Sequence, residues 1–296
     1  MCVTITGFDA MSETSASPHG PVGVESLAQW LRCPSCGHDL AAVERLTLGC
    51  TNGHRFDVNK KGYVSLLRGG TKLVGDDAGM LDARDLVQQS ETFAELAGIV
   101  ADNALGRRIL DAGAGTGFYL RAALARSTDR LGLAMDLSPA AVARAVRSSD
   151  RIAGLVADTW KPIPVRSQAA DTVLNIFAPR NLAEFHRVLR PDGTLIVVVP
   201  RADHLHELRA SVAMLDVPAD KADDVAAAAA PLFDQEKREH FSAGLRLDAR
   251  LATALVEMGP SARHASAVAP GGAPDTGVSV PRSTTISVDV LTFRRG

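Results

Sequence analysis

Two closely spaced pairs of potential metal ligands constrain this chain more than any other feature of its sequence. Cys33 and Cys36 are separated by two residues, and Cys50 and His54 by three. The short loop between the pairs allows them to converge, and three thiolates with one imidazole form a ligand set for tetrahedral zinc rather than for calcium or magnesium. The alternatives are unrelated cysteines, or a redox pair at Cys33 and Cys36, but two matched pairs are more specific than either. Four protein ligands leave no open position, so we expect a structural zinc ion and look for the chemistry elsewhere.

Charge is spread unevenly along a chain whose overall composition is ordinary. The 296 residues can form a main domain and a smaller one, with a formal net charge of −2. Residues 27–72 contain seven basic and three acidic side chains, which predicts either a surface for an anionic partner or a merely solvated basic face. We find no apolar run of membrane-spanning length and no secretory signal, so we expect no membrane partner. Free cysteines in a zinc pattern fit a reducing compartment, so we expect a cytoplasmic protein. Residues 1–26 are predicted to be a disordered tail.

Strands and helices alternate through the middle of the chain, after a helical stretch at 76–103. This alternation predicts an α/β fold with a parallel sheet and helices on both faces. Beyond it we expect mainly helix over 205–251 with a strand near 237–247, a loop at 259–281 and a last strand at 284–293. The predicted strands of the alternating region are Ile109–Ala112, Leu131–Asp136, Ile152–Ala157, Ala170–Phe177 and Thr194–Val199. Its predicted helices are Tyr119–Ala125, Pro139–Arg147 and Leu182–Leu189.

The first strand of this region runs into a glycine loop, Asp111–Gly117, that opens a helix. Its Gly-x-Gly-x-Gly spacing is tighter than the dinucleotide pattern. The acid that precedes the glycines, Asp111, would also repel the pyrophosphate of a dinucleotide. The same acid would favour a sulfonium or an amino group. Asp136 ends the next strand, where a carboxylate can accept both ribose hydroxyls, and Asp158 follows the third strand, where it could meet an adenine edge. A cationic, phosphate-free ligand with a ribose is S-adenosylmethionine, and NAD is the main rival. Asp136 could also cap the next helix together with Ser138.

A polar and aromatic segment, Asn175–Arg180, ends the fourth strand. In a sheet of this kind that end lies near the transferable methyl group. Asn175 and Phe177 could hold a planar base by hydrogen bonds and stacking. An ordinary strand end with a proline stop is the alternative.

Several motifs, taken together, resemble those of a known family. Besides the zinc ligands and the glycine loop they are Phe56-Asp57, the stretch Lys61–Leu67, the stretch Asp76–Arg84 and Asn175–Pro179. Their order resembles that of the bacterial large-subunit rRNA (guanine-N1)-methyltransferases, which modify the loop of one 23S rRNA stem-loop near the peptide exit tunnel. Details such as Met258–Ser261 are more similar to the tylosin-resistance subgroup, whereas Ser261–His264 lacks an expected tryptophan.

The resemblance implies a Rossmann-like class I methyltransferase sheet with a small N-terminal zinc-binding domain. The implied units are an RNA-recognition domain with zinc at 27–70, a helical linker at 71–104 and the methyltransferase domain at 105–296. S-adenosylmethionine and structural Zn²⁺ are the implied cofactors, and a 23S rRNA stem-loop and a second copy of the chain are the implied partners. The favoured target is a guanine of the 748 type rather than the 745 type, with resistance to macrolides such as tylosin as a consequence. Two alternatives stay open: a zinc-containing methyltransferase of a small metabolite, and a non-catalytic RNA-binding protein.

The expected site residues fall into four groups. The zinc ligands are Cys33, Cys36, Cys50 and His54. The cofactor residues are Tyr63, Asp111, Gly113, Gly115, Gly117, Phe118, Tyr119, Asp136, Leu137, Asp158, Thr159 and Asn175. The catalytic candidates are Asp76, Asn175 and Phe177, and the RNA contacts are Arg55, Lys60, Lys61, Arg68 and Lys72. Guanine N1 must lose a proton, for which Asp76, Asp77, Asp158 or water are the possible acceptors.

Overall fold

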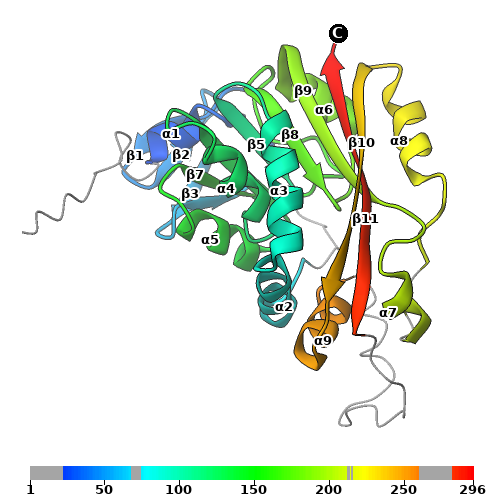
Figure 1. Cartoon of the computed structure of the whole chain (residues 1–296). Coiled ribbons are helices and arrows are strands. Elements are labelled where there is room, and N and C mark those ends of the chain that lie inside the picture. The colour runs from blue at the N-terminus through cyan, green and yellow to red at the C-terminus, as the bar shows by residue number, and fades with distance from the viewer. Residues whose placement is uncertain (1–22, 68–74, 212–213, 215, 260–281) are drawn as a thin grey trace, which may run out of the picture.

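The fold is built on one mixed sheet with helices on both faces (Figure 1). The computed structural model describes residues 23–67, 75–211, 214, 216–259 and 282–296. Arg68, Lys72, Ser261–His264, most of the predicted tail and nearly all of the loop predicted at 259–281 lie outside the described residues.

Eleven strands form the sheet within these ranges, in the order β1-β2-β3-β4-β7-β6-β5-β8-β9-β11-β10. The strands are β1 (Ala41–Glu44), β2 (Thr47–Gly49), β3 (Arg55–Asn59), β4 (Tyr63–Ser65), β5 (Arg108–Ala112), β6 (Leu131–Asp136), β7 (Ile152–Val156), β8 (Ala170–Ile176), β9 (Leu189–Pro200), β10 (Phe233–Arg246) and β11 (Ser283–Arg295). The strands β5 to β9 are parallel to one another, as the alternation predicted, and β4 adds to them in parallel beside β7, which the alternation did not predict. At one edge β11 pairs antiparallel with β9 and β10, and at the other β1 to β4 form an antiparallel meander.

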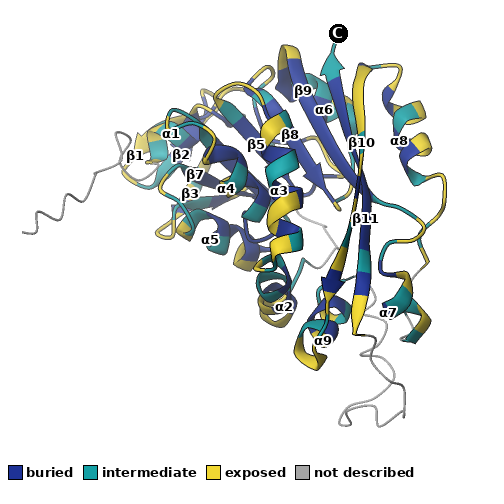
Figure 2. Cartoon of the chain, in the orientation of Figure 1, coloured by how far each residue is buried: buried dark blue, intermediate teal, exposed yellow. Residues whose placement is uncertain are grey.

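Alternating residues of the strands belong to two separate hydrophobic clusters, one on each face of the sheet. Ile109, Ala134 and Ile152 pack with α2 to α5 and α9, whereas their neighbours Leu110 and Leu133 pack with α1, α6 and α8. Figure 2 shows the central strands buried between these helices. The helices are α1 (Val24–Ala28), α2 (Ala78–Gln88), α3 (Glu91–Asn103), α4 (Phe118–Leu124), α5 (Pro139–Arg147), α6 (Leu182–Val188), α7 (His206–Ser211), α8 (Lys221–Ala229) and α9 (Ala249–Glu257).

The stretch predicted as a helical linker forms α2 and α3, which pack onto neighbouring helices. Helix α2 contacts α9, and α3 contacts α4, β10 and β11. Asp77 caps α2, because its side chain accepts a hydrogen bond from the Met80 amide at 3.0 Å. None of the helices in the described part of the chain is both long and apolar enough to cross a membrane.

The N-terminal module, residues 23–67, is continuous with the main sheet. Strand β4 pairs in parallel with β7, so that Tyr63 faces Gly154 and Ser65 faces Val156. A Cβ atom at Gly154 would lie 2.5 Å from that of Tyr63, so glycine is needed for this close approach. Trp30 is 2% exposed and is covered by the Arg108 guanidinium, 4.1 Å from its ring centroid. The module and the main sheet therefore share a core, and their predicted division into domains stays a prediction.

Candidate functional site

The four predicted zinc ligands converge on one point. Their ligand atoms all lie within 4.8 Å of one another. The Sγ atoms of Cys36 and Cys50 are 3.6 Å apart, and His54 Nδ1 is 3.3 Å from Cys50 Sγ and 3.6 Å from Cys33 Sγ. Tetrahedral ligands about 2.3 Å from zinc would lie roughly 3.8 Å apart, so the donor set fits this ion with little adjustment.

Each ligand pair sits on a tight turn that the local sequence specifies. Gly37 and Gly53 have φ values of 78° and 80°, which suit glycine, and their amides donate to Cys33 O at 2.9 Å and Cys50 O at 3.0 Å. Burial opposes ionisation of Cys50, but hydrogen bonds with His54, Cys36 and the Asn52 backbone together outweigh it and lower the pKa of this thiol to about 6. A thiolate is the form that binds zinc, so the electrostatics agree with the geometry.

The glycine loop at the carboxyl end of β5 is fixed by the next strand. The amides of Gly113 and Ala114 both donate to Met135 O, at 2.8 and 3.0 Å. Gly113 has a φ of 92°, and a Cβ atom there would lie 2.4 Å from the Ala178 side chain, so only glycine fits. Asp136 accepts from the Gly115 amide with one oxygen and from the Ser138 amide with the other, both at 2.9 Å. The Ser138 hydroxyl accepts from the Ala141 amide at 3.3 Å and so caps α5, as the alternative reading of Asp136 and Ser138 expected.

Unpaired polar atoms are buried around this loop. They are Asp111 Oδ1, Tyr119 Oη, Asn175 Oδ1 and Arg84 Nε. Burial, followed by the nearby Asp136 carboxylate, raises the pKa of Asp111 to about 8, and burial raises that of Tyr119. Buried polar groups normally have partners, so this set of donors and acceptors indicates a ligand site. An acid and a guanidinium, both with unpaired atoms at this loop, could hold the amino and carboxylate groups of S-adenosylmethionine.

A cavity of about 460 Å³ adjoins the loop and contains the predicted base-binding aromatic. Phe177 is 41% exposed and has a φ of 52°, a conformation that costs energy for a residue other than glycine. Its ring lies 6.0 Å from that of His204, whose pKa burial lowers to about 4, so this imidazole is neutral near pH 7. Basic side chains on the cavity wall are Arg84, Arg180, Arg209 and Lys221.

The other catalytic candidates are held by the protein itself. Asn175 is fully buried and donates to Ala112 O at 3.1 Å and Pro179 O at 2.8 Å, which leaves only its oxygen for a ligand. Asp76 accepts from Arg84 at 2.5 Å, and Asp77 is occupied as the cap of α2. Asp158 is buried and accepts from the Trp160 amide at 2.9 Å.

The remaining predicted site residues do not all lie near the glycine loop. Arg55 begins β3, and Lys60 and Lys61 form the turn before β4; all three are exposed. Because β4 is parallel to β7, that turn lies at the end of the sheet opposite the glycine loop. Tyr63 lies on the face covered by α5, and Phe118 lines a second cavity with Arg121 and Arg147. Leu137 and Thr159 follow β6 and β7 at the carboxyl edge.

Two cavity residues were not singled out from the sequence. Arg84 lies in α2, far along the chain from the glycine loop, yet a Cβ atom at Gly115 would lie 3.3 Å from its guanidinium. His204 follows β9 and could have been found by the rule that polar residues after strands face the ligand crevice. No local spacing indicates Arg84.

Comparison with known proteins agrees with both halves of this site. Residues 31–72 match the family model described as "RlmA, N-terminal", and residues 109–193 match the methyltransferase domain model. A 23S rRNA (guanine(748)-N(1))-methyltransferase of Streptomyces fradiae is 41% identical over 81% of this chain and 88% of its own length. A putative 23S rRNA (guanine-N(1)-)-methyltransferase of Micromonospora griseorubida is 38% identical over 79% of this chain and 87% of its own length. With its zinc ligands and methyltransferase sheet in place, the chain belongs to the family of 23S rRNA (guanine-N1)-methyltransferases, enzymes that use S-adenosylmethionine.

Proposed function

We propose that this protein transfers a methyl group from S-adenosylmethionine to N1 of a guanine in a stem-loop of 23S rRNA. The observation that supports this most is the joining of a Cys₃His module and an open methyltransferase crevice in one sheet. The proposed position is guanine 748, as in the name of the S. fradiae relative, with resistance to macrolides such as tylosin as the consequence.

We assign the cofactor to the unpaired atoms around the glycine loop. S-adenosylmethionine supplies an electrophilic methyl group on a sulfonium ion. Asp111 would take its amino group, Arg84 its carboxylate and Asp136 its ribose hydroxyls, since each Asp136 oxygen keeps a free lone pair beside its backbone bond. Asp158 would meet the adenine edge.

The cavity next to Gly113 would receive the target guanine. Phe177 at this cavity offers an aromatic face, and a base in a loop costs less to unstack than one in a duplex. Holding N1 in line with the methyl group supplies most of the rate gain in such a transfer. The neutral His204 imidazole is a further acceptor for the N1 proton, beside Asp76, Asp158 and water.

The exposed basic residues of the N-terminal module would contact RNA phosphates. Zinc would keep this module in shape, and the chain would act as a homodimer. Contacts of Arg55, Lys60 and Lys61 with phosphates predict binding that weakens steeply with salt.

The test is incubation of the zinc-loaded protein with labelled S-adenosylmethionine and deproteinised 23S rRNA, followed by mapping of the modified nucleotide by reverse transcription. A methyl group on N1 blocks base pairing, so we expect one stop at the target guanine. A bound cofactor with no label in the RNA would refute the proposal. Label in a small molecule instead would favour a metabolite methyltransferase, and RNA binding without transfer would favour a non-catalytic protein.

A further inference from the structure

One of the two tryptophans of this chain is exposed at the carboxyl edge of the sheet. Trp160 is 60% exposed, whereas Trp30 is 2% exposed in the core. Among the described residues, Trp160 is the most exposed of the large hydrophobic side chains. Burial in the core therefore does not explain this tryptophan.

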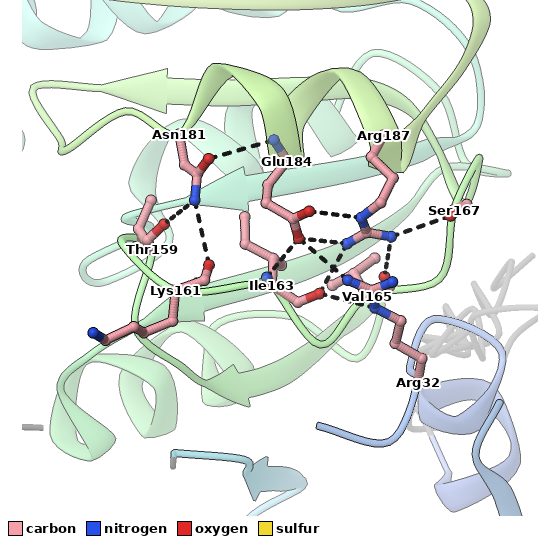
Figure 3. Close-up of polar contacts among 9 residues, drawn as sticks. All are labelled: Arg32, Thr159, Lys161, Ile163, Val165, Ser167, Asn181, Glu184 and Arg187. Atoms are coloured by element: carbon pink, nitrogen blue, oxygen red, sulfur yellow. Dashed lines mark hydrogen bonds and ion pairs between the residues drawn. The ribbon is translucent and has the colours of Figure 1, made fainter. Parts of the chain in front are cut away.

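The backbone on both sides of Trp160 is held firmly. Asp158 accepts from the Trp160 amide at 2.9 Å with its side chain and from the Lys161 amide at 3.1 Å with its carbonyl. The Asn181 side chain donates to Thr159 O at 2.9 Å and to Lys161 O at 3.3 Å (Figure 3). The indole is thus presented to solvent from a fixed loop, which lowers the entropy cost of binding a partner.

This loop lies between the end of the zinc module, just after β4, and the target cavity. It follows β7, and on one side the Leu66 amide after β4 donates to Val156 O at 3.0 Å, which brings the end of the zinc module beside it. On the other side Asn181 ends the segment that begins with Phe177 at the target cavity. An RNA loop that reaches from the module to the cavity would pass Trp160.

The Glu184 carboxylate forms hydrogen bonds with both the same loop and the zinc module. Glu184 accepts from the Ile163 amide at 2.6 Å, from Arg187 at 2.7 and 2.8 Å, and from Arg32 at 3.4 Å (Figure 3). Arg32 precedes the zinc ligand Cys33. The loop that carries Trp160 and the zinc cluster are therefore kept in a fixed relation.

We propose that Trp160 is a stacking surface for an RNA base that flanks the target guanine. An indole offers a flat π-face to any base, and specific RNA readers stack unpaired bases on aromatic side chains. The neighbouring Lys161 is exposed and supplies a positive charge for the phosphate of that nucleotide. This inference rests on the proposed function.

Tryptophan fluorescence gives a direct test, because Trp160 is the accessible indole and Trp30 is buried. The target stem-loop RNA, added to the zinc-loaded full chain, should quench the emission, and the quenching should be absent in Trp160→Ala. In the same variant the KM for the stem-loop should rise by about 5- to 100-fold, the range that stacking of one base supports. The Trp160→Phe variant should recover most of this loss. The affinity for S-adenosylmethionine should stay at the wild-type value.

Leu105→Ala is the matched control, since Leu105 is 49% exposed and precedes β5 at the other end of the sheet. It should leave the KM for RNA unchanged. The inference is overturned if Trp160→Ala methylates the stem-loop with the wild-type KM, if cofactor affinity falls as much as RNA affinity, or if the variant changes only the oligomeric state. Methylation by the wild type in any of these cases would leave the proposed function standing. A wild type that neither binds nor methylates the RNA would refute both.

Discussion

The zinc cluster and the glycine-loop crevice both form at turns of the chain, but they differ in whether their polar atoms have partners. In the cluster, every predicted ligand points at the other three, and the turn amides donate to the chain's own carbonyls. In the crevice, the loop amides are also paired, yet Asp111, Tyr119 and Arg84 keep buried atoms without partners.

This difference separates a site that supports structure from one that binds a substrate. Four converging ligands are satisfied by an ion alone and leave no position for chemistry. Buried atoms without partners cost stability until a ligand supplies what they lack. The pKa of about 8 at Asp111 is a sign of this cost, because it reflects a carboxyl group that is buried without a cation.

The largest effect should follow from removing the carboxylate that serves both the loop and the ligand. Asp136→Ala leaves the Gly115 and Ser138 amides without their acceptors and removes the proposed ribose contact. We expect the affinity for S-adenosylmethionine to fall by at least about 100-fold by calorimetry, with a folded circular dichroism spectrum. Asp150→Ala, at an exposed position before β7, is the control. Retained binding in Asp136→Ala would remove the ribose role and weaken the contrast between the two sites.

A smaller effect should come from the ion-pair network that joins the two regions. Glu184→Gln removes a charge shared by Arg187 and Arg32 and should lower the free energy of unfolding by about 2 kcal/mol in urea titrations. Burial opposes ionisation of Glu184, but Arg187, the Ile163 amide and Arg32 together outweigh it and lower its pKa. The stabilisation is therefore present above the unfolded pKa near 4.5 and lost as the pH falls through the lowered pKa.

The wild type and Glu184→Gln should accordingly converge in stability in acid. Glu95→Gln changes an exposed glutamate of α3 and should match the wild type throughout. A constant difference between wild type and Glu184→Gln down to low pH would show that the charge of Glu184 is not the cause.

The smallest effect should be a pH dependence of cofactor binding. With a pKa of about 8, Asp111 is mostly protonated at pH 7, and a cationic ligand favours its carboxylate form. Raising the pH through 8 should therefore strengthen binding of S-adenosylmethionine, by about fivefold between pH 7 and 8 at most, with a proton released on binding below that pH. Calorimetry in buffers of different ionisation enthalpy measures this release.

Asp111→Asn should abolish the release that belongs to the protein. It should also stabilise the free protein at neutral pH, because a neutral amide avoids the buried charge. The same proton release in wild type and variant would assign it to the ligand instead.

Features that depend on local spacing could be predicted from the sequence, whereas features that depend on contacts between distant segments could not. The zinc ligands and the glycine loop are short patterns whose residue types have few other uses, and the alternation of strands and helices predicted the parallel strands from β5 to β9. The pairing of β4 with β7 could not be predicted, because it joins segments about ninety residues apart and depends on Gly154 to admit Tyr63. Arg84 ends a stretch that carried the family resemblance, but the role of Arg84 and that of Glu184 depend on contacts with distant segments, so the sequence did not single out either residue.

The most direct test of the contrast is removal of the metal with two readouts on the same sample. The zinc-loaded protein and a protein treated with a chelator are compared for binding of S-adenosylmethionine and for methyl transfer to the rRNA stem-loop. In the proposed division of roles the zinc module selects RNA and the crevice binds the methyl donor, so transfer should be lost and cofactor affinity should stay within about threefold, a difference of roughly 0.7 kcal/mol. Undiminished methyl transfer by the metal-free protein, or a parallel loss of cofactor binding, would contradict this account.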